Sequence, residues 1–193
     1  MNDDYYQHNA QRFYDDTVDV DMSAVYKPFL RHLKPGARIL DAGCGSGRDT
    51  KAFSEMGFKV EAFDASAELV ERAKQLTGKH VKVMRFQDLT AVEQYDGIWC
   101  CASLLHVPEK ELPEVMKLLA IALKPGSVWY LSFKYGRGER EKDGRCFTDM
   151  DEEGIREITS ESEALTLTEM WTTKDRRTER DDVWINAVLK KVF

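Results

Sequence analysis

The sequence is poor in several informative features, and each shortage excludes a class of protein. Among 193 residues there are four cysteines, none in the paired C-x-x-C spacing of metal and redox motifs, so we expect free thiols in a reducing cytoplasm and assign no metal ligands. No apolar run approaches the roughly 20 residues of a membrane span. The polar, acidic N-terminus is also unlike a signal peptide. We therefore expect a cytoplasmic protein that does not contact membranes.

Positive charge is scarce as well. Lysine and arginine number 28 against 34 aspartates and glutamates, a net charge of −6. Proteins that hold a nucleic-acid backbone are usually basic, at least in patches, so this balance argues against such a partner. The length fits one domain with a sizeable core. We predict a single domain, residues 1–193, with an N-terminal helical segment at 1–34 and a Rossmann-like core at 35–193.

Helical and strand patterns alternate along the chain. Helices are expected at 22–33, 48–56, 66–76, 109–123 and 149–160. Strands are expected at 37–42, 58–63, 80–86, 95–101, 127–134, 165–173 and 183–192. Two LKPG tetrapeptides, at Leu33 and Leu123, should each stop a helix just before a strand, and residues 135–148 should form a mobile polar loop.

The order of these elements predicts an α/β fold. Alternating strands and helices indicate a doubly wound, mostly parallel sheet of seven strands with helices on both faces. The last two strands have no helix between them, only the charged run 174–182. They must therefore pair as a C-terminal antiparallel hairpin.

The segment ILDAGCGSGRD, residues 39–49, lies between an expected strand and an expected helix. A glycine-rich turn at that place lets a ligand approach the backbone closely. The dinucleotide pattern G-x-G-x-x-G needs glycine at position 48, where Arg48 stands, and a pyrophosphate would be repelled by Asp41. A cationic ligand gains from Asp41 instead. S-adenosylmethionine has an ammonium group, a sulfonium and no phosphate, so it suits this loop better than NAD does.

Later carboxylates agree with that interpretation. Asp64 ends the second strand, where an acidic side chain can accept hydrogen bonds from both ribose hydroxyls. Asp88, in the segment Phe86-Gln87-Asp88-Leu89 after the third strand, can accept from an adenine amino group. An ordinary loop or helix-cap aspartate is the alternative for each.

With these motifs the chain resembles the class I (Rossmann-like) S-adenosylmethionine-dependent methyltransferases. The similar segments are ILDAGCGSGRD, AFDAS, FQDL, YDGIWCCASLLHVP and LKPGSVWYLSF. The resemblance implies S-adenosylmethionine as cofactor, S-adenosylhomocysteine as product and direct methyl transfer. It implies these cofactor-binding residues: Asp41, Gly43, Gly45, Gly47, Arg48, Asp64, Ala65, Asp88, Leu89 and Cys101. Gly45 to Arg48 also resembles small bacterial methyltransferases associated with tellurite resistance, a likeness that does not carry a substrate with it.

The acceptor side is expected after the fourth and fifth strands. There His106 is the candidate general base, with a helix cap or a substrate contact as alternatives. Residues 134–145 hold five cationic against three acidic side chains, which suits an anionic acceptor or a solvated loop equally well. The aromatic residues of the first segment are expected to form a lid or to pack on the core: Tyr5, Tyr6, Phe13 and Tyr14.

Several functions fit these residues. The first is methyl transfer to a small molecule. The alternatives are a methyltransferase acting on RNA or protein, and a non-catalytic S-adenosylmethionine-binding protein. A nicotinamide-dependent oxidoreductase is disfavoured by Arg48 and by the terminal hairpin. The sequence does not determine the acceptor atom or the oligomeric state.

Overall fold

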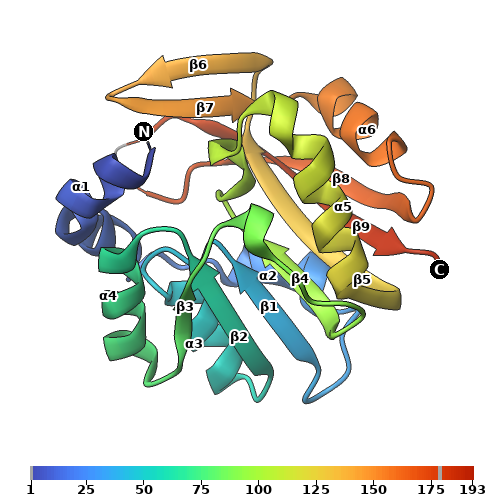
Figure 1. Ribbon diagram of the computed structural model, residues 1–193, viewed down its shortest axis with the longest axis horizontal. Coiled ribbons are helices and arrows are strands. Elements are labelled where there is room, and N and C mark those ends of the chain that lie inside the picture. Colours follow the sequence, from blue (N-terminus) through green and yellow to red (C-terminus); the bar gives the residue numbers. More distant parts are fainter. Residues whose placement is uncertain (1, 178–179) are drawn as a thin grey trace.

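One sheet of seven strands organises the molecule, and a separate two-stranded hairpin lies beyond the carboxyl ends of its parallel strands (Figure 1). The computed structural model describes residues 2–177 and 180–193, so Thr178 and Glu179 of the charged run lie outside the described residues. The strands are β1 (Arg38–Ala42), β2 (Lys59–Asp64), β3 (Val81–Val83), β4 (Tyr95–Cys100), β5 (Leu123–Lys134), β6 (Gly138–Lys142), β7 (Arg145–Asp149), β8 (Leu165–Lys174) and β9 (Val183–Lys191).

The strand order in the sheet is β3-β2-β1-β4-β5-β9-β8. Strands β1 to β5 pair in parallel, whereas β9 lies antiparallel to both β5 and β8. The predicted doubly wound sheet with a C-terminal antiparallel hairpin is therefore confirmed. The order reverses direction between β1 and β4, and ligands of such sheets bind beyond the carboxyl ends of the strands at that point.

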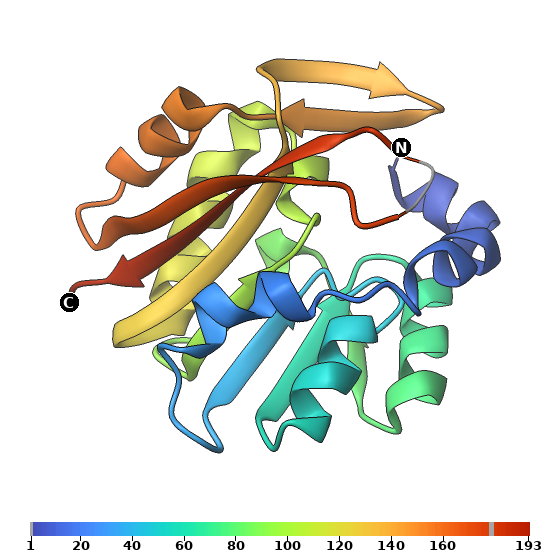
Figure 2. The same ribbon diagram turned by 180° about the vertical axis from the view of Figure 1, so that it is seen from behind.

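Helices cover both faces of the sheet (Figures 1 and 2). The α-helices are α1 (Asn2–Thr17), α2 (Ser23–Leu30), α3 (Arg48–Glu55), α4 (Ala67–Thr77), α5 (Leu112–Ala122) and α6 (Glu152–Ser160). Helices α2, α3 and α4 pack on one face, where the buried Trp99 ring stacks on Tyr130 with 3.8 Å between ring centroids. Helices α5 and α6 pack on the other. No helix in the described part of the chain is long and apolar enough to cross a membrane.

Residues 135–148 form a hairpin and not the expected mobile loop. Strands β6 and β7 pair antiparallel with Lys142 opposite Arg145, so Asp143 and Gly144 make a two-residue turn. Both turn residues have positive φ, +55° and +73°, which is the geometry that Asp-Gly favours in tight hairpins. The pattern was present in the sequence, but the charged flanks lacked the alternation of apolar residues that marks a strand.

The sheet departs from expectation at two further places. The second LKPG tetrapeptide belongs to β5, because Leu123 pairs with Tyr95 before the register shifts at Gly97. The third strand is shorter than predicted, since β3 spans only Val81–Val83. Residues Phe86–Asp88 turn into the 3-10 helix η1.

Helix α1 lies across the carboxyl ends of the first strands, beside α4 (Figure 1). The Gln11 side chain accepts a hydrogen bond from Arg72 of α4 at 3.1 Å. Thr17, at the C-terminal end of α1, donates to the Ser46 hydroxyl at 3.2 Å. Helix α1 thus rests on the loop between β1 and α3.

Candidate functional site

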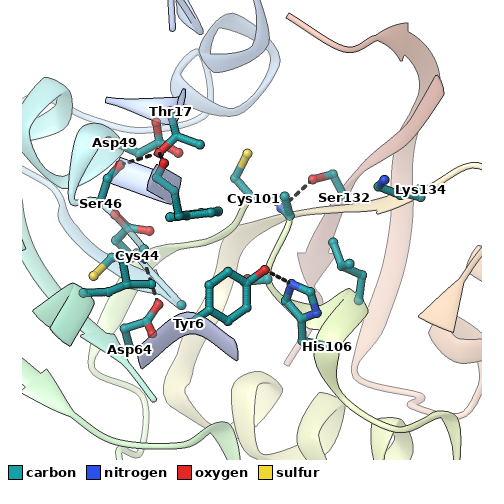
Figure 3. A pocket seen from close by; sticks show the side chains of 18 of the residues that line it. Tyr6, Thr17, Cys44, Ser46, Asp49, Asp64, Cys101, His106, Ser132 and Lys134 are labelled. Atoms are coloured by element: carbon teal, nitrogen blue, oxygen red, sulfur yellow. Dashed lines mark hydrogen bonds between the residues drawn. The ribbon is translucent and has the colours of Figure 1, made fainter. Parts of the chain in front are cut away.

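A cavity of about 580 Å³ lies beyond the carboxyl ends of the parallel strands (Figure 3). Its walls come from α1, the glycine loop, the ends of β2, β4 and β5, the β6–β7 hairpin and the β8–β9 connection. Segments that lie far apart in the sequence therefore meet around one space. A volume of this size is typical of a small-molecule site.

The glycine loop is shaped by its packing within the protein. Gly43 has φ +77°, and a Cβ there would lie 2.5 Å from the Ser103 Cβ. A Cβ on Gly45, at φ +54°, would lie 3.0 Å from the Phe13 ring of α1. Side chains are excluded at these two positions because the chain after β4 and the N-terminal helix press against the loop. The sequence explained the glycines by ligand approach alone, and it could not reveal these neighbours.

Asp64 lies at the end of β2 and faces the cavity (Figure 3). Its two carboxylate oxygens accept hydrogen bonds from the backbone N–H groups of Gly45 and Ser66, each at 2.9 Å. These bonds fix the carboxylate relative to the glycine loop. An acidic side chain at this place in the fold can accept hydrogen bonds from two ligand hydroxyls. Ala65 follows it in the cavity wall.

Two further carboxylates are buried under the loop. Asp41 is 2% exposed and accepts from the Thr50 hydroxyl at 2.6 Å. Burial, together with the neighbouring Asp49, raises the pKa of Asp41 to about 8. The carboxyl of Asp41 is therefore protonated at neutral pH unless a positive charge lies beside it. A cationic ligand at this end of the cavity would supply that charge.

Asp49 is held by an unusually complete set of donors. It accepts from the Tyr26 hydroxyl at 2.6 Å, from the Trp99 indole N–H at 2.8 Å and from the Arg48 guanidinium at 2.6 Å. Burial alone would raise the pKa of Asp49, but the adjacent Arg48 and these hydrogen bonds lower it. Asp49 is thus the ionised member of the pair and Asp41 the protonated one. Asp49 was not among the residues predicted for the site, although it ends the segment ILDAGCGSGRD.

Arg48, the first residue of α3, and Cys101, which follows β4, both line the cavity. Arg48 lines it but is engaged by both carboxylate oxygens of Asp49, and its Nη1 lies 3.4 Å from the carbonyl of Thr17. The Arg48 Nη2 lies 3.9 Å from the Cys101 sulfur. Burial raises the pKa of the Cys101 thiol to about 12, so the group stays protonated at neutral pH. It fills space beside the arginine as a small apolar side chain.

Three expected cofactor residues, Gly47, Asp88 and Leu89, are absent from the cavity wall. Gly47, at φ +82°, packs against α4, where a Cβ would lie 2.9 Å from the Ala73 Cβ. The Asp88 side chain is exposed and accepts from the Arg85 backbone N–H at 3.2 Å, which caps η1. Leu89 is buried in the core. The wall at this place is made by Phe86 and Gln87. The early end of β3 and the turn into η1 explain this shift, and neither could be inferred from the alternation of residues.

His106 lies in the cavity wall with both ring nitrogens engaged (Figure 3). Its Nδ1 lies 3.3 Å from the Cys146 carbonyl, which can only accept, so Nδ1 carries the proton. Its Nε2 then accepts from the Tyr6 hydroxyl at 2.7 Å. Burial lowers the pKa of His106 to about 4, so the ring is neutral at pH 7. Tyr6 of α1 stands between the histidine and the rest of the cavity.

Basic residues are frequent in the cavity wall, and most of them come from β5, the β6–β7 hairpin and the β8–β9 connection. Among the charged side chains in its wall, cations are more frequent than acids, although the whole chain is acidic. The cations are Arg48, Arg85, Lys134, Arg145, Lys174, Arg176, Arg177 and Arg180; the acids are Asp41, Asp49, Asp64, Glu111 and Asp175. The sequence pointed to residues 134–145 but treated the run 174–182 only as a connection. Its place in the wall depends on how β8 and β9 pair.

Comparison with known proteins relates part of the chain to methyltransferases and the whole of it to their fold. Residues 39–126 match the family model described as a methyltransferase domain. The chain is similar to the ubiquinone biosynthesis O-methyltransferase of Xanthomonas campestris pv. campestris, strain B100, with 34% identity over 105 residues. That match covers 51% of this chain and 43% of the relative, so the chain spans less than half the length of the curated relative.

Solved structures share the fold over nearly the whole chain. The 1,6-didemethyltoxoflavin-N1-methyltransferase of Burkholderia thailandensis superposes with a TM-score of 0.79 at 20% identity, covering 98% of this chain and 85% of that one. The magnesium protoporphyrin IX methyltransferase of Synechocystis PCC 6803 superposes with a TM-score of 0.75 at 19% identity, covering 97% and 94%. The chain therefore has the fold of the class I (Rossmann-like) methyltransferases, and its residues 39–126 match a methyltransferase-domain model.

Proposed function

We propose that this chain transfers a methyl group from S-adenosylmethionine directly to a small, anionic acceptor. The observation that carries the proposal is Asp64: a carboxylate oriented by two backbone N–H groups at the end of β2, facing a cavity of about 580 Å³. That arrangement suits the two hydroxyls of a ribose. The relatives named above support a small acceptor, since ubiquinone precursors, a toxoflavin precursor and a magnesium porphyrin are small molecules.

The acidic end of the cavity fits the charges of this cofactor. Asp41 is the carboxyl that gains most from an adjacent ammonium group, because burial and Asp49 now hold it protonated. Arg48, fixed by Asp49, presents its guanidinium to the same region and suits a carboxylate. When bound, S-adenosylmethionine supplies an electrophilic methyl group on a sulfonium. The residues of the chain hold it, exclude water and align the acceptor.

His106 and Tyr6 form the candidate proton-transfer pair. The tautomer set by Cys146 leaves the Nε2 lone pair of His106 pointing at the Tyr6 hydroxyl. An acceptor hydroxyl or N–H that donates to the Tyr6 oxygen would pass its proton on to His106 through that bond. His106 is then the base and Tyr6 the group that meets the acceptor. An acceptor that is already ionised needs no such step, since alignment alone supplies much of the rate.

The cavity walls favour a small acceptor over RNA or protein. Helix α1 and the β6–β7 hairpin both contribute to the wall and meet each other, with the Arg145 guanidinium 4.3 Å from the Tyr5 ring centroid. A macromolecular substrate would have to separate these elements. The resemblance to tellurite-resistance methyltransferases stays a prediction, which a screen that includes oxyanions would test.

The first test is calorimetric titration with S-adenosylhomocysteine, with NADH as the control ligand. We expect micromolar binding of S-adenosylhomocysteine and none of NADH, because the acidic loop repels a pyrophosphate. Binding of NADH alone would overturn the cofactor assignment. Binding of S-adenosylhomocysteine without turnover of any acceptor would favour a non-catalytic binding protein.

A further inference from the structure

Arg145, the first residue of β7, is a buried cation with little neutralising charge around it. Its side chain is 14% exposed and lines the cavity. The nearest acid is Asp143, 3.7 Å away on a side chain that is 65% exposed, so water screens that pair. The buried Nε of Arg145 has no hydrogen-bond partner among the described residues. A buried charged donor without an acceptor is costly, and it marks a place where an acceptor is expected.

Other cations near the cavity already have partners. Lys134 lies 2.8 Å from Asp182, and Arg48 is bound by Asp49. Arg177 pairs with Asp175, next to it in the β8–β9 connection. Arg145 differs from these because its one acidic partner is distant and exposed. Lys174 and Arg176, which also line the cavity, are exposed to solvent, whereas the Arg145 side chain is only 14% exposed, so water screens its charge less.

Aromatic rings hold the Arg145 guanidinium in place. It lies 4.3 Å from the ring centroid of Tyr5 and 5.1 Å from that of Phe147. Two further cationic groups lie near the Phe147 ring centroid, the Lys134 Nζ at 5.2 Å and the Arg140 Cζ at 4.8 Å. Three cationic groups thus lie around one ring, and two of them are paired with acids, Lys134 with Asp182 and Arg140 with Asp149. Arg145 lies against two rings, those of Tyr5 and Phe147.

We propose that Arg145 anchors a carboxylate of the acceptor, so that the substrates of this domain are small carboxylic acids. The proposal rests on the methyl-transfer function proposed above and names its substrate class. A planar guanidinium packed against two rings, with its Nε unpaired among the described residues, suits a carboxylate, which can accept two parallel N–H hydrogen bonds from such a group. The acceptor then spans from Arg145 past Tyr6 towards the glycine loop, with its reacting atom at the end remote from the carboxylate.

The test measures binding of carboxylates and of their amides to three proteins. Benzoate, salicylate and nicotinate, each paired with its neutral amide, are titrated into wild-type protein, R145Q and K142Q. The titrations are run with and without saturating S-adenosylhomocysteine. Lys142 is the matched control: it lies opposite Arg145 in the same hairpin and carries the same charge, but it is exposed and absent from the cavity wall. The variant R145K keeps the charge without the planar fork.

We expect at least one carboxylate to bind the wild-type protein and K142Q alike, and to bind R145Q roughly 10- to 100-fold more weakly, as loss of a charge-assisted hydrogen bond requires. The carboxylate affinity of R145K should lie between those of the wild-type protein and R145Q. The amides should bind all of these proteins weakly. Equal binding of carboxylate and amide, an undiminished affinity in R145Q, or no binding of any carboxylate would overturn the proposal. Failure of S-adenosylhomocysteine to bind, with carboxylate binding intact, would instead refute the cofactor assignment.

Discussion

The two ends of the cavity are built in different ways. The acidic end comes from a nearly continuous stretch, residues 41–66, in which a glycine loop and a strand-end carboxylate are joined by backbone hydrogen bonds. The basic end is assembled from α1, β5, the β6–β7 hairpin and the β8–β9 connection, which are distant in sequence. The acidic end is therefore a local motif, and the basic end is a product of tertiary structure. The first suits a shared cofactor and the second an acceptor specific to this chain.

The largest expected effect is on the acidic end. Replacing Asp64 with alanine removes a carboxylate that can accept two ligand hydroxyls, so affinity for S-adenosylhomocysteine should fall by about 100-fold or more. Calorimetric titration measures it. Asp88→Ala is the matched control, because Asp88 also follows a strand of the sheet yet caps η1 outside the cavity. Equal losses in the two variants would mean that the cavity does not hold the ribose at Asp64.

The next largest effect is expected on turnover at the acceptor side of the cavity, with cofactor binding little changed. His106→Ala should lower kcat about 100-fold, as expected for loss of a general base, while affinity for S-adenosylhomocysteine changes little. Tyr6→Phe should lower kcat by a similar factor if the proton passes through the phenol oxygen. A normal kcat in Tyr6→Phe with a low one in His106→Ala would mean that His106 meets the acceptor directly. Normal turnover in both variants would show that neither Tyr6 nor His106 takes part in catalysis.

The pH profile gives an independent check on this pair. Burial holds the pKa of His106 at about 4, below its ordinary value near 6.5. The ring therefore stays a neutral base over the range from pH 5.5 to pH 8, and kcat should show no acid limb near pH 6.5. An acid limb there in wild-type protein that disappears in His106→Gln would show that His106 is solvated during turnover.

The smallest expected effect concerns proton release on cofactor binding. Below pH 8 the Asp41 carboxyl is protonated in the free protein, because burial and Asp49 raise its pKa to about 8. An ammonium beside it favours the ionised form, so binding expels a proton and affinity should rise with pH between 6 and 8, by at most about tenfold per unit. Titration in buffers of different ionisation enthalpy measures the release. Asp41→Asn should bind more weakly and lose the pH dependence, and an unchanged pH profile would place the ammonium elsewhere.

The sequence predicted the acidic end better than the basic end for a physical reason. The bond from Ser66 to Asp64 spans two residues, and the bond from Gly45 to Asp64 joins the loop after β1 to the end of β2, the neighbouring strand that comes next in the chain. Such geometry follows from residue type and spacing. The same reasoning placed Asp88 beside the ligand, but Asp88 lies outside the cavity because β3 ends early. The ends of strands depend on pairing with neighbouring strands more than on propensity. Arg145 lay in a segment expected to be mobile, although Asp143-Gly144 is a hairpin signal.

The sequence by itself determined the order of elements, the glycine loop with Asp41 and Asp64, and the class of the fold. Periodicity, turn residues and a strand-end carboxylate act over a few residues, so each can be recognised without knowing what packs against it. Tertiary structure alone decided that α1 presses on Gly45, that Tyr6 bonds His106 across 100 residues, and that cations collect around Phe147. Those contacts join segments that lie far apart in the chain, so no short stretch of the chain encodes them.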